Sequence, residues 1–123
     1  MKFISTSLHG TLDYLVSILL IISPWILGYY HTGIESIIPV LLGVSTISIS
    51  LMTDYEKGIL RVIPMKTHLL IDIITGLLLA ASPWIFGFSE VVYKPHLAFG
   101  IVEIVAALCT TAIPKDKPDT NLI

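Results

Sequence analysis

The stretch LLIISPWILG at residues 19–28 recurs almost unchanged as LLAASPWIFG at residues 78–87. When residues 9–28 are laid over residues 68–87, a shift of 59, nine of the twenty positions are identical. The identities include histidine, aspartate, proline, tryptophan and glycine, which chance rarely aligns within apolar runs. The chain therefore contains an internal repeat.

The repeated stretch predicts how each copy ends. Its key residues are Ser23, Pro24, Trp25 and Gly28 in the first copy and Ser82, Pro83, Trp84 and Gly87 in the second. Proline removes a backbone hydrogen bond, so we expect each helix to bend there. The tryptophan is typical of an anchor at a membrane interface, and the glycine lets the chain turn.

The amino-acid composition predicts a membrane protein. It has 123 residues, 54% of them hydrophobic and 13% charged, with a mean hydropathy of +0.88, whereas soluble domains carry about 25% charged residues. The gaps between charges approach the ~20 residues that span a bilayer as helix. They predict transmembrane helices at 6–30, 35–53, 67–88 and 95–113.

Each repeat then consists of two helices, so both copies insert the same way up. We predict an all-α membrane protein whose four transmembrane helices form two parallel, same-orientation helical hairpins in a small bundle. The single membrane domain, 1–123, is divided into repeat one (6–53), a cytoplasmic interfacial linker (54–66), repeat two (67–113) and a cytoplasmic tail (114–123).

Lysine and arginine predict the orientation. Six of the seven lie before the first helix, between the second and third, or after the fourth, and Lys94 alone lies on the other side. The positive-inside rule therefore predicts that both termini are cytoplasmic. Asp13 interrupts the first apolar run, which argues against a signal peptide. The net charge of −2 gives no indication of nucleic-acid binding.

The doubled SPW motif has an aspartate ten residues before each serine and a glycine three residues after each tryptophan. In this the chain resembles the SPW-repeat integral membrane proteins of prokaryotes, and the resemblance covers almost its whole length. It implies a small bacterial inner-membrane protein and no particular activity. Within the chain, Glu103 departs from the repeat, because Thr46 stands at the matching position, a shift of 57.

Helical spacing gathers polar and small residues on one face of each helix, and we expect these four interior stripes to face one another. The stripes are His9, Asp13, Ser17, Leu20 and Pro24; Pro39, Gly43, Thr46, Ser50 and Thr53; His68, Asp72, Gly76, Leu79 and Pro83; and His96, Gly100, Glu103, Ala107 and Thr110. Gly43, Gly76 and Gly100 are predicted points of close helix packing.

Five ionisable residues form a candidate intramembrane polar site: His9, Asp13, His68, Asp72 and Glu103. His-x-x-x-Asp spacing lets the two side chains of each pair meet one helical turn apart. One reading is structural, with each pair stabilising the start of its helix. The other is functional, with the two pairs forming a proton relay, metal site or ligand site, since intramembrane ionisable groups are functional candidates. Glu103 suits either proton coupling or a buried hydrogen bond.

These observations favour a structural or accessory bundle in the lipid bilayer, as a monomer or a homo-oligomer, with no protein partner indicated. The alternative is a proton- or ion-coupled transport protein that uses the five residues. A metal- or haem-binding protein is a further alternative, although the spacing is not the Glu-x-x-His of di-iron bundles. The sequence contains no catalytic motif and so predicts no enzyme, and it assigns no cofactor. Its one cysteine, Cys109, forms no intrachain disulfide.

Overall fold

A computed structural model of the protein describes residues 2–116. Its regular elements are α1 (Thr6–Ile26), α2 (Ile34–Met52), α3 (Met65–Ile85) and α4 (Lys94–Leu108). The described residues contain two isolated backbone bridges and no strand, so the all-α prediction is confirmed. Of the tail predicted at 114–123, the part after residue 116 lies outside the described residues.

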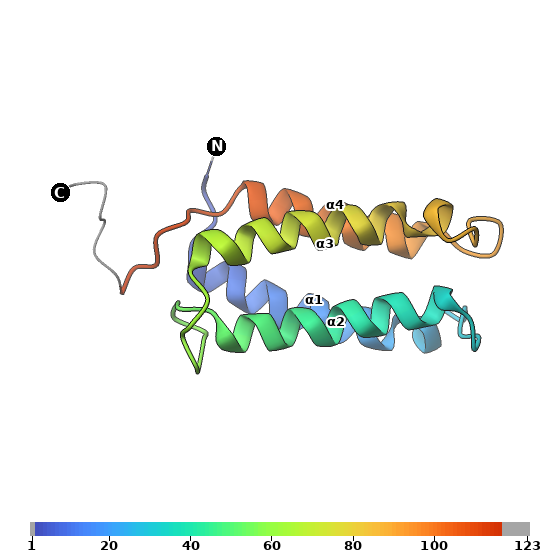
Figure 1. Cartoon of the computed structure of the whole chain (residues 1–123), viewed down its shortest axis with the longest axis horizontal. Helices are drawn as coiled ribbons and strands as arrows, with labels where there is room; N and C mark the ends of the chain where they lie inside the picture. Colours follow the sequence, from blue (N-terminus) through green and yellow to red (C-terminus); the bar gives the residue numbers. More distant parts are fainter. Residues whose placement is uncertain (1, 117–123) are drawn as a thin grey trace.

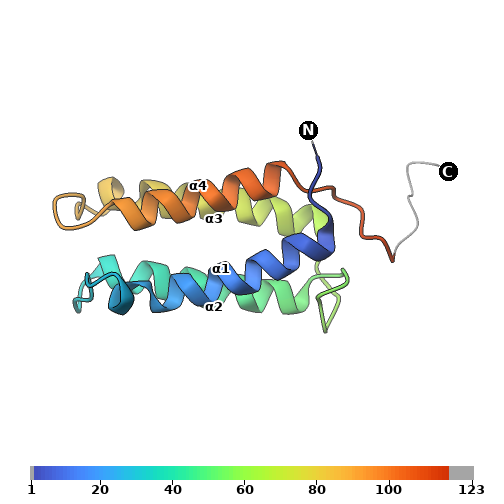
Figure 2. The ribbon, with the colours of Figure 1, turned by 180° about the vertical axis from the view of Figure 1, so that it is seen from behind.

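The helices form two antiparallel hairpins that lie one against the other (Figure 1). α1 packs along α2 and α3 along α4, and the hairpins meet through α2 with α3 and α1 with α4. Both views show α1 and α3 starting at the end of the molecule that carries the N terminus (Figures 1 and 2). We call this the terminal end. The opposite end, where both SPW motifs lie, is the SPW end.

The serine of each SPW motif compensates for a helical hydrogen bond that the following proline removes. Pro24 has no N–H to donate to the Leu20 carbonyl four residues earlier. The Ser23 hydroxyl donates to that carbonyl instead, at 2.8 Å. In the second copy the Ser82 hydroxyl donates to the Leu79 carbonyl at 2.7 Å. Pro83 leaves this carbonyl without a helical N–H donor in the same way. The serine therefore replaces the donor that the proline removes.

Both SPW helices end sooner than the predicted residues 30 and 88, at Ile26 and Ile85. The cause is the glycine that follows. Gly28 and Gly87 have φ angles of 73° and 74°, the left-handed conformation that ends a helix at low cost in glycine. The next residue then bonds back to the proline carbonyl, at 3.0 Å in the first copy and 2.8 Å in the second.

The tryptophans point away from the bundle. Trp25 and Trp84 are 56% and 53% exposed, and each packs against an aromatic ring of the adjacent loop, Tyr30 at 5.0 Å and Tyr93 at 5.7 Å between ring centroids. Tryptophan and tyrosine are typical of a membrane interface, and one such aromatic pair lies at the SPW end of each hairpin.

The fourth helix is shorter than the predicted 95–113, because α4 ends at Leu108. Beyond it the backbone pairs with the N-terminal segment: the Ile4 N–H donates to the Cys109 carbonyl at 2.9 Å, and the Thr111 N–H donates to the Ile4 carbonyl at 3.1 Å. These bonds replace the helical ones. The 15 residues of α4 rise about 22 Å, less than the ~30 Å hydrocarbon core.

The four interior stripes do face inward, as predicted. All their residues are buried except Asp13, whose side chain is 11% exposed. Towards the SPW end the interior is closed by an apolar cluster, which consists of Leu20, Ile38, Leu79 and Phe88 with Leu42, Val92 and Phe99 packed against it. The interior near the SPW end also buries polar side chains, among them Ser23, Ser82 and His96, but the buried carboxylates of α1 and α3 lie nearer the terminal end.

Small residues set the spacing within each hairpin. A Cβ atom on Gly100 would lie 2.5 Å from the Gly76 carbonyl oxygen, and one on Gly43 would lie 2.9 Å from the Ser17 carbonyl oxygen. Both crossings therefore bring backbone against backbone, which is how small residues support membrane helix packing. The crossings occupy matching positions in the two repeats.

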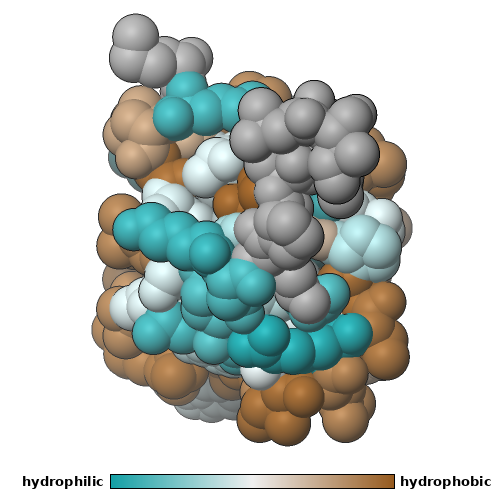
Figure 3. Space-filling view, turned by 90° about the vertical axis from the view of Figure 1, so that its left-hand side faces the viewer, coloured by the Kyte–Doolittle hydropathy of each residue, from teal (hydrophilic) through white to brown (hydrophobic). Residues whose placement is uncertain are grey.

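The outer surface of the bundle is apolar. α1, α2 and α3 are long and apolar enough to cross a membrane, whereas α4 is not among the helices that meet this length. Exposed leucine, isoleucine and valine side chains cover the sides of all four helices. Figure 3 looks onto the terminal end and shows hydrophilic residues gathered on this face with hydrophobic residues around it.

Candidate functional site

Four of the five predicted site residues meet between the two hairpins. His9 and Asp13 come from α1, and His68 and Asp72 come from α3. Each offers one nitrogen or carboxylate oxygen to a common centre, and the four atoms lie within 4.8 Å of one another. We call these residues the His/Asp ring. Glu103 is not a member of it.

Within the ring, nitrogen and oxygen alternate. His9 Nε2 lies 2.9 Å from Asp72 Oδ2 and 3.2 Å from Asp13 Oδ2. His68 Nε2 lies 2.8 Å from Asp13 Oδ2 and 3.1 Å from Asp72 Oδ2. The sequence predicts only the pairs within one helix. The structure adds the pairs between helices, and these are the shorter contacts.

Two threonines determine which imidazole nitrogen carries a hydrogen. Thr53 Oγ1 lies 2.7 Å from His68 Nδ1, and Thr110 Oγ1 lies 2.8 Å from His9 Nδ1. Each hydroxyl donates its single hydrogen to a backbone carbonyl one turn earlier in its own helix, at 2.7 Å and 2.6 Å. Each threonine must therefore accept from the histidine, so Nδ1 of both rings bears a hydrogen.

This tautomer leaves both Nε2 atoms facing carboxylate oxygens. A bare Nε2 lone pair at these distances from an ionised carboxylate is repulsive, because both atoms are hydrogen-bond acceptors. A hydrogen or a cation must therefore lie between them, as a second hydrogen on the imidazole, as a hydrogen on the carboxyl group, or as a bound metal ion. The ring can thus act as a double ion pair or as a cation site.

The ring has an approximate two-fold symmetry that exchanges the repeats. His9 of repeat one bonds to Thr110 and Asp72 of repeat two, and His68 of repeat two bonds to Thr53 and Asp13 of repeat one. Neither hairpin contains a complete set, so the ring forms only when the two hairpins pack together.

The connection between α2 and α3 covers the ring at the terminal end. Tyr55 is fully buried, with its ring centroid 5.7 Å from that of His68. The Tyr14 hydroxyl donates to the Lys57 carbonyl at 2.8 Å. Burial raises the pKa of the Tyr55 phenol well above its usual range. The phenol is therefore a neutral cover over the ring.

Glu103 lies apart from the ring, on α4. It is 9% exposed, and its nearest polar partner is the Thr75 hydroxyl at the long distance of 3.4 Å. That hydroxyl already donates to the Ile71 carbonyl at 2.9 Å. The structure therefore does not bring Glu103 to the common centre.

A haem group does not fit between the two histidines. A porphyrin held by both would have to pass between His9 Nε2 and His68 Nε2. Asp13 and Asp72 occupy that space, in hydrogen-bond contact with both rings. The haem alternative is therefore not supported by this geometry.

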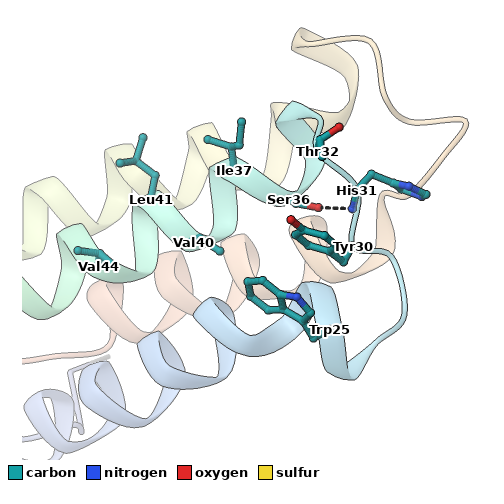
Figure 4. A pocket seen from close by; sticks show the side chains of 9 residues that line it. All are labelled: Trp25, Tyr30, His31, Thr32, Ser36, Ile37, Val40, Leu41 and Val44. Atoms are coloured by element: carbon teal, nitrogen blue, oxygen red, sulfur yellow. Dashed lines mark hydrogen bonds between the residues drawn. The ribbon is translucent and has the colours of Figure 1, made fainter.

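A different hollow lies at the SPW end, with a volume of about 550 Å³. Figure 4 shows Trp25 pointing towards Val40 of α2 and Tyr30 lying beside Ser36, whose hydroxyl accepts from the His31 N–H at 2.9 Å. Its walls are mostly apolar and its large side chains are about half exposed. It is a groove on the apolar surface, with no converging ionisable groups.

Sequence reasoning did not assign a role to Thr53, Thr110 and Tyr55. The two threonines had a signal, because both stand on interior stripes and match each other with the same shift of 57 as Gly43 and Gly100. Tyr55 had none, since its burial depends on how the connection folds back over the terminal end.

The family model described as the SPW repeat domain matches residues 7–110 of the chain. This span includes both SPW motifs, all four residues of the His/Asp ring and both threonines. No curated protein and no solved structure matches the chain.

Proposed function

Because the chain belongs to the SPW repeat family, we propose that it is a small integral membrane protein with a structural or accessory role, built from four spanning helices. The two hairpins are same-orientation repeats, and the His/Asp ring joins them across the interior. Three helices of spanning length and the apolar sides of the bundle support the membrane assignment.

The proposal includes α4 as a span despite its length. α4 begins at Lys94 beside the loops of the SPW end, and Thr110, two residues beyond it, bonds to His9 near the terminal end. The segment 94–110 therefore runs the same course as α3, against which it packs. A helix of this length suffices where neighbouring helices cover its ends or the bilayer thins.

The proposed orientation has the terminal end in the cytoplasm, which the distribution of lysine and arginine supports, and the proposed location is a prokaryotic cell membrane, which the resemblance to the SPW-repeat family supports. The test is labelling of single cysteines in intact cells, in a Cys109→Ser background. Thr32→Cys, at the SPW end, should react with a membrane-impermeant maleimide from outside. Lys57→Cys should react only after the membrane is opened. The reverse pattern would invert the proposed topology.

The observation that carries the structural role is the filled interior. The apolar cluster of Leu20, Leu79 and Phe88 fills the space between the hairpins towards the SPW end, which favours a packed bundle over an open channel. The ring instead makes four contacts between ionisable groups of α1 and α3, two of them linking the hairpins directly. Breaking a buried pair typically costs about 3–5 kcal/mol.

The Asp13→Asn and Asp72→Asn double variant tests this role. We expect a lower thermal unfolding temperature in detergent than for the parent, and no proton or ion flux for either protein in liposomes. Glu90→Gln, an exposed acidic residue of the loop at the SPW end, is the control and should unfold like the parent. If the double variant is as stable as the parent but abolishes a flux that the parent shows, the transport alternative replaces the structural role.

A further inference from the structure

We propose that the His/Asp ring is a metal site that binds one divalent first-row transition-metal ion, with zinc as the reference ion, between the two hairpins. The two Nε2 atoms and one carboxylate oxygen of each aspartate are the ligands. The inference goes beyond the structural role and does not depend on it, because a stable bundle can exist with or without the ion.

The distances suit such an ion. Zinc–nitrogen and zinc–oxygen bonds of about 2.1 Å in a tetrahedral site hold neighbouring ligand atoms about 3.4 Å apart. The four neighbouring contacts of the ring measure 2.8, 2.9, 3.1 and 3.2 Å. These four distances need to lengthen by only about 0.2–0.6 Å to reach that spacing, and all six pairs of the four ligand atoms already lie within 4.8 Å.

The hydrogen bonds to threonine prepare both histidines as ligands. A metal-bound imidazole usually donates its other N–H to an oxygen acceptor, which fixes the tautomer and the ring orientation. Thr53 and Thr110 accept these hydrogens at 2.7 Å and 2.8 Å. Because their own hydrogens go to backbone carbonyls, the threonines hold both Nε2 lone pairs towards the centre of the ring.

Charge also matches a divalent cation. Two ionised aspartates and two neutral imidazoles around a 2+ ion sum to zero, which a buried site in a membrane protein requires. Two nitrogen and two oxygen ligands suit zinc, iron, cobalt or manganese, whereas magnesium and calcium prefer oxygen ligands alone. The donor set therefore predicts selection against magnesium and calcium.

The described residues also indicate an entry side. Asp13 is the most exposed member of the ring at 11%, against 6% for Asp72 and 1% or less for the histidines. The connection that carries Tyr55 and Lys57 packs tightly against α1 at this end, where a Cβ on Gly10 would lie 2.6 Å from the Tyr55 ring, so it has to shift to admit an ion. An ion would enter from the terminal end beside Asp13.

The first experiment uses the full-length protein in detergent, freed of metal with EDTA. Titration with zinc by calorimetry should give one ion per chain, and magnesium at the same concentrations should give no binding. Cobalt should produce the visible absorption bands of a tetrahedral site with nitrogen ligands. These measurements need no variant, so the proposal stays testable even if ring variants fold poorly.

Variants then locate the site. His68→Gln should abolish zinc binding. Thr53→Val and Thr110→Val, which keep the side-chain shape and remove only the acceptor, should each weaken zinc binding by about 10- to 100-fold. His31→Ala, an exposed histidine at the SPW end, and Glu103→Gln are the controls and should bind like the parent.

Three results would overturn the proposal: no zinc binding above the magnesium level, a cobalt spectrum without nitrogen ligands, or zinc binding that His31→Ala removes and His68→Gln leaves intact. The first would mean that hydrogens, rather than an ion, lie between the Nε2 atoms and the carboxylate oxygens of the ring. Each is distinct from failure of the structural role, which the stability of the double aspartate variant decides.

Discussion

The serine of the second SPW motif offers a sharp test of how the motif works. Ser82 is fully buried, and its hydroxyl donates at 2.7 Å to the Leu79 carbonyl, the group left without its helical donor by Pro83. Replacing Ser82 by alanine leaves this buried carbonyl unpaired. An unpaired buried acceptor costs about 1–3 kcal/mol, while measured interhelical hydrogen bonds in membranes average about 0.6 kcal/mol. We therefore expect Ser82→Ala to cost about 1–2 kcal/mol.

Pro83→Ala provides the decisive background, because alanine restores an N–H that can donate to the same carbonyl. Ser82→Ala should then cost almost nothing in a Pro83→Ala protein, and the double-mutant cycle should show a coupling of about 1 kcal/mol. Ser48→Ala, at an exposed position of α2, is the control for an ordinary bond between a serine hydroxyl and a helix carbonyl. Its hydroxyl also bonds a carbonyl, that of Val44 at 2.9 Å, but no proline follows it.

The measurement is unfolding of the purified protein in mixed micelles by denaturing detergent, followed through tryptophan fluorescence. If Ser82→Ala costs the same in the parent as in the Pro83→Ala protein, the serine does not replace the donor that the proline lacks. A cost of Ser82→Ala no larger than that of Ser48→Ala would also refute this replacement. The Ser82 hydroxyl would then contribute no more than a serine hydroxyl on the helix surface.

Three further outcomes are expected. Gly100→Ala should destabilise the protein by about 1–3 kcal/mol in the same unfolding assay, because its Cβ would meet the backbone of α3 at 2.5 Å; an unchanged stability would mean that α3 and α4 part without cost. The only two tryptophans, Trp25 and Trp84, should be quenched by lipids labelled near the headgroup and not by lipids labelled at mid-chain, and the opposite order would contradict their interfacial position. Tyr29→Phe should cost under about 1 kcal/mol, since it removes only the 2.6 Å contact with the Ser23 hydroxyl, and repeat two has phenylalanine at this position; a larger loss would show that this bond holds the first hairpin.

The helix ends show where local sequence reasoning reaches its limit. The start of α1 follows from Ser5, whose hydroxyl accepts from the Leu8 N–H at 3.1 Å, a local capping interaction. The end of α4 at Leu108 does not follow from local signals, because the apolar pattern continues to Ile113. It depends on backbone bonds with Ile4, which lies more than a hundred residues away in the chain.

The sequence by itself determined the helical class, the two repeats and the inward faces, because these depend on hydrophobic periodicity and on matching residues at fixed shifts. It also determined that His9 can reach Asp13. Only the tertiary structure decided that His9 lies closer to Asp72 than to Asp13, and that each histidine takes its threonine from the other repeat. The spacing of residues along one helix cannot determine such partners, because they depend on how the two hairpins pack against each other.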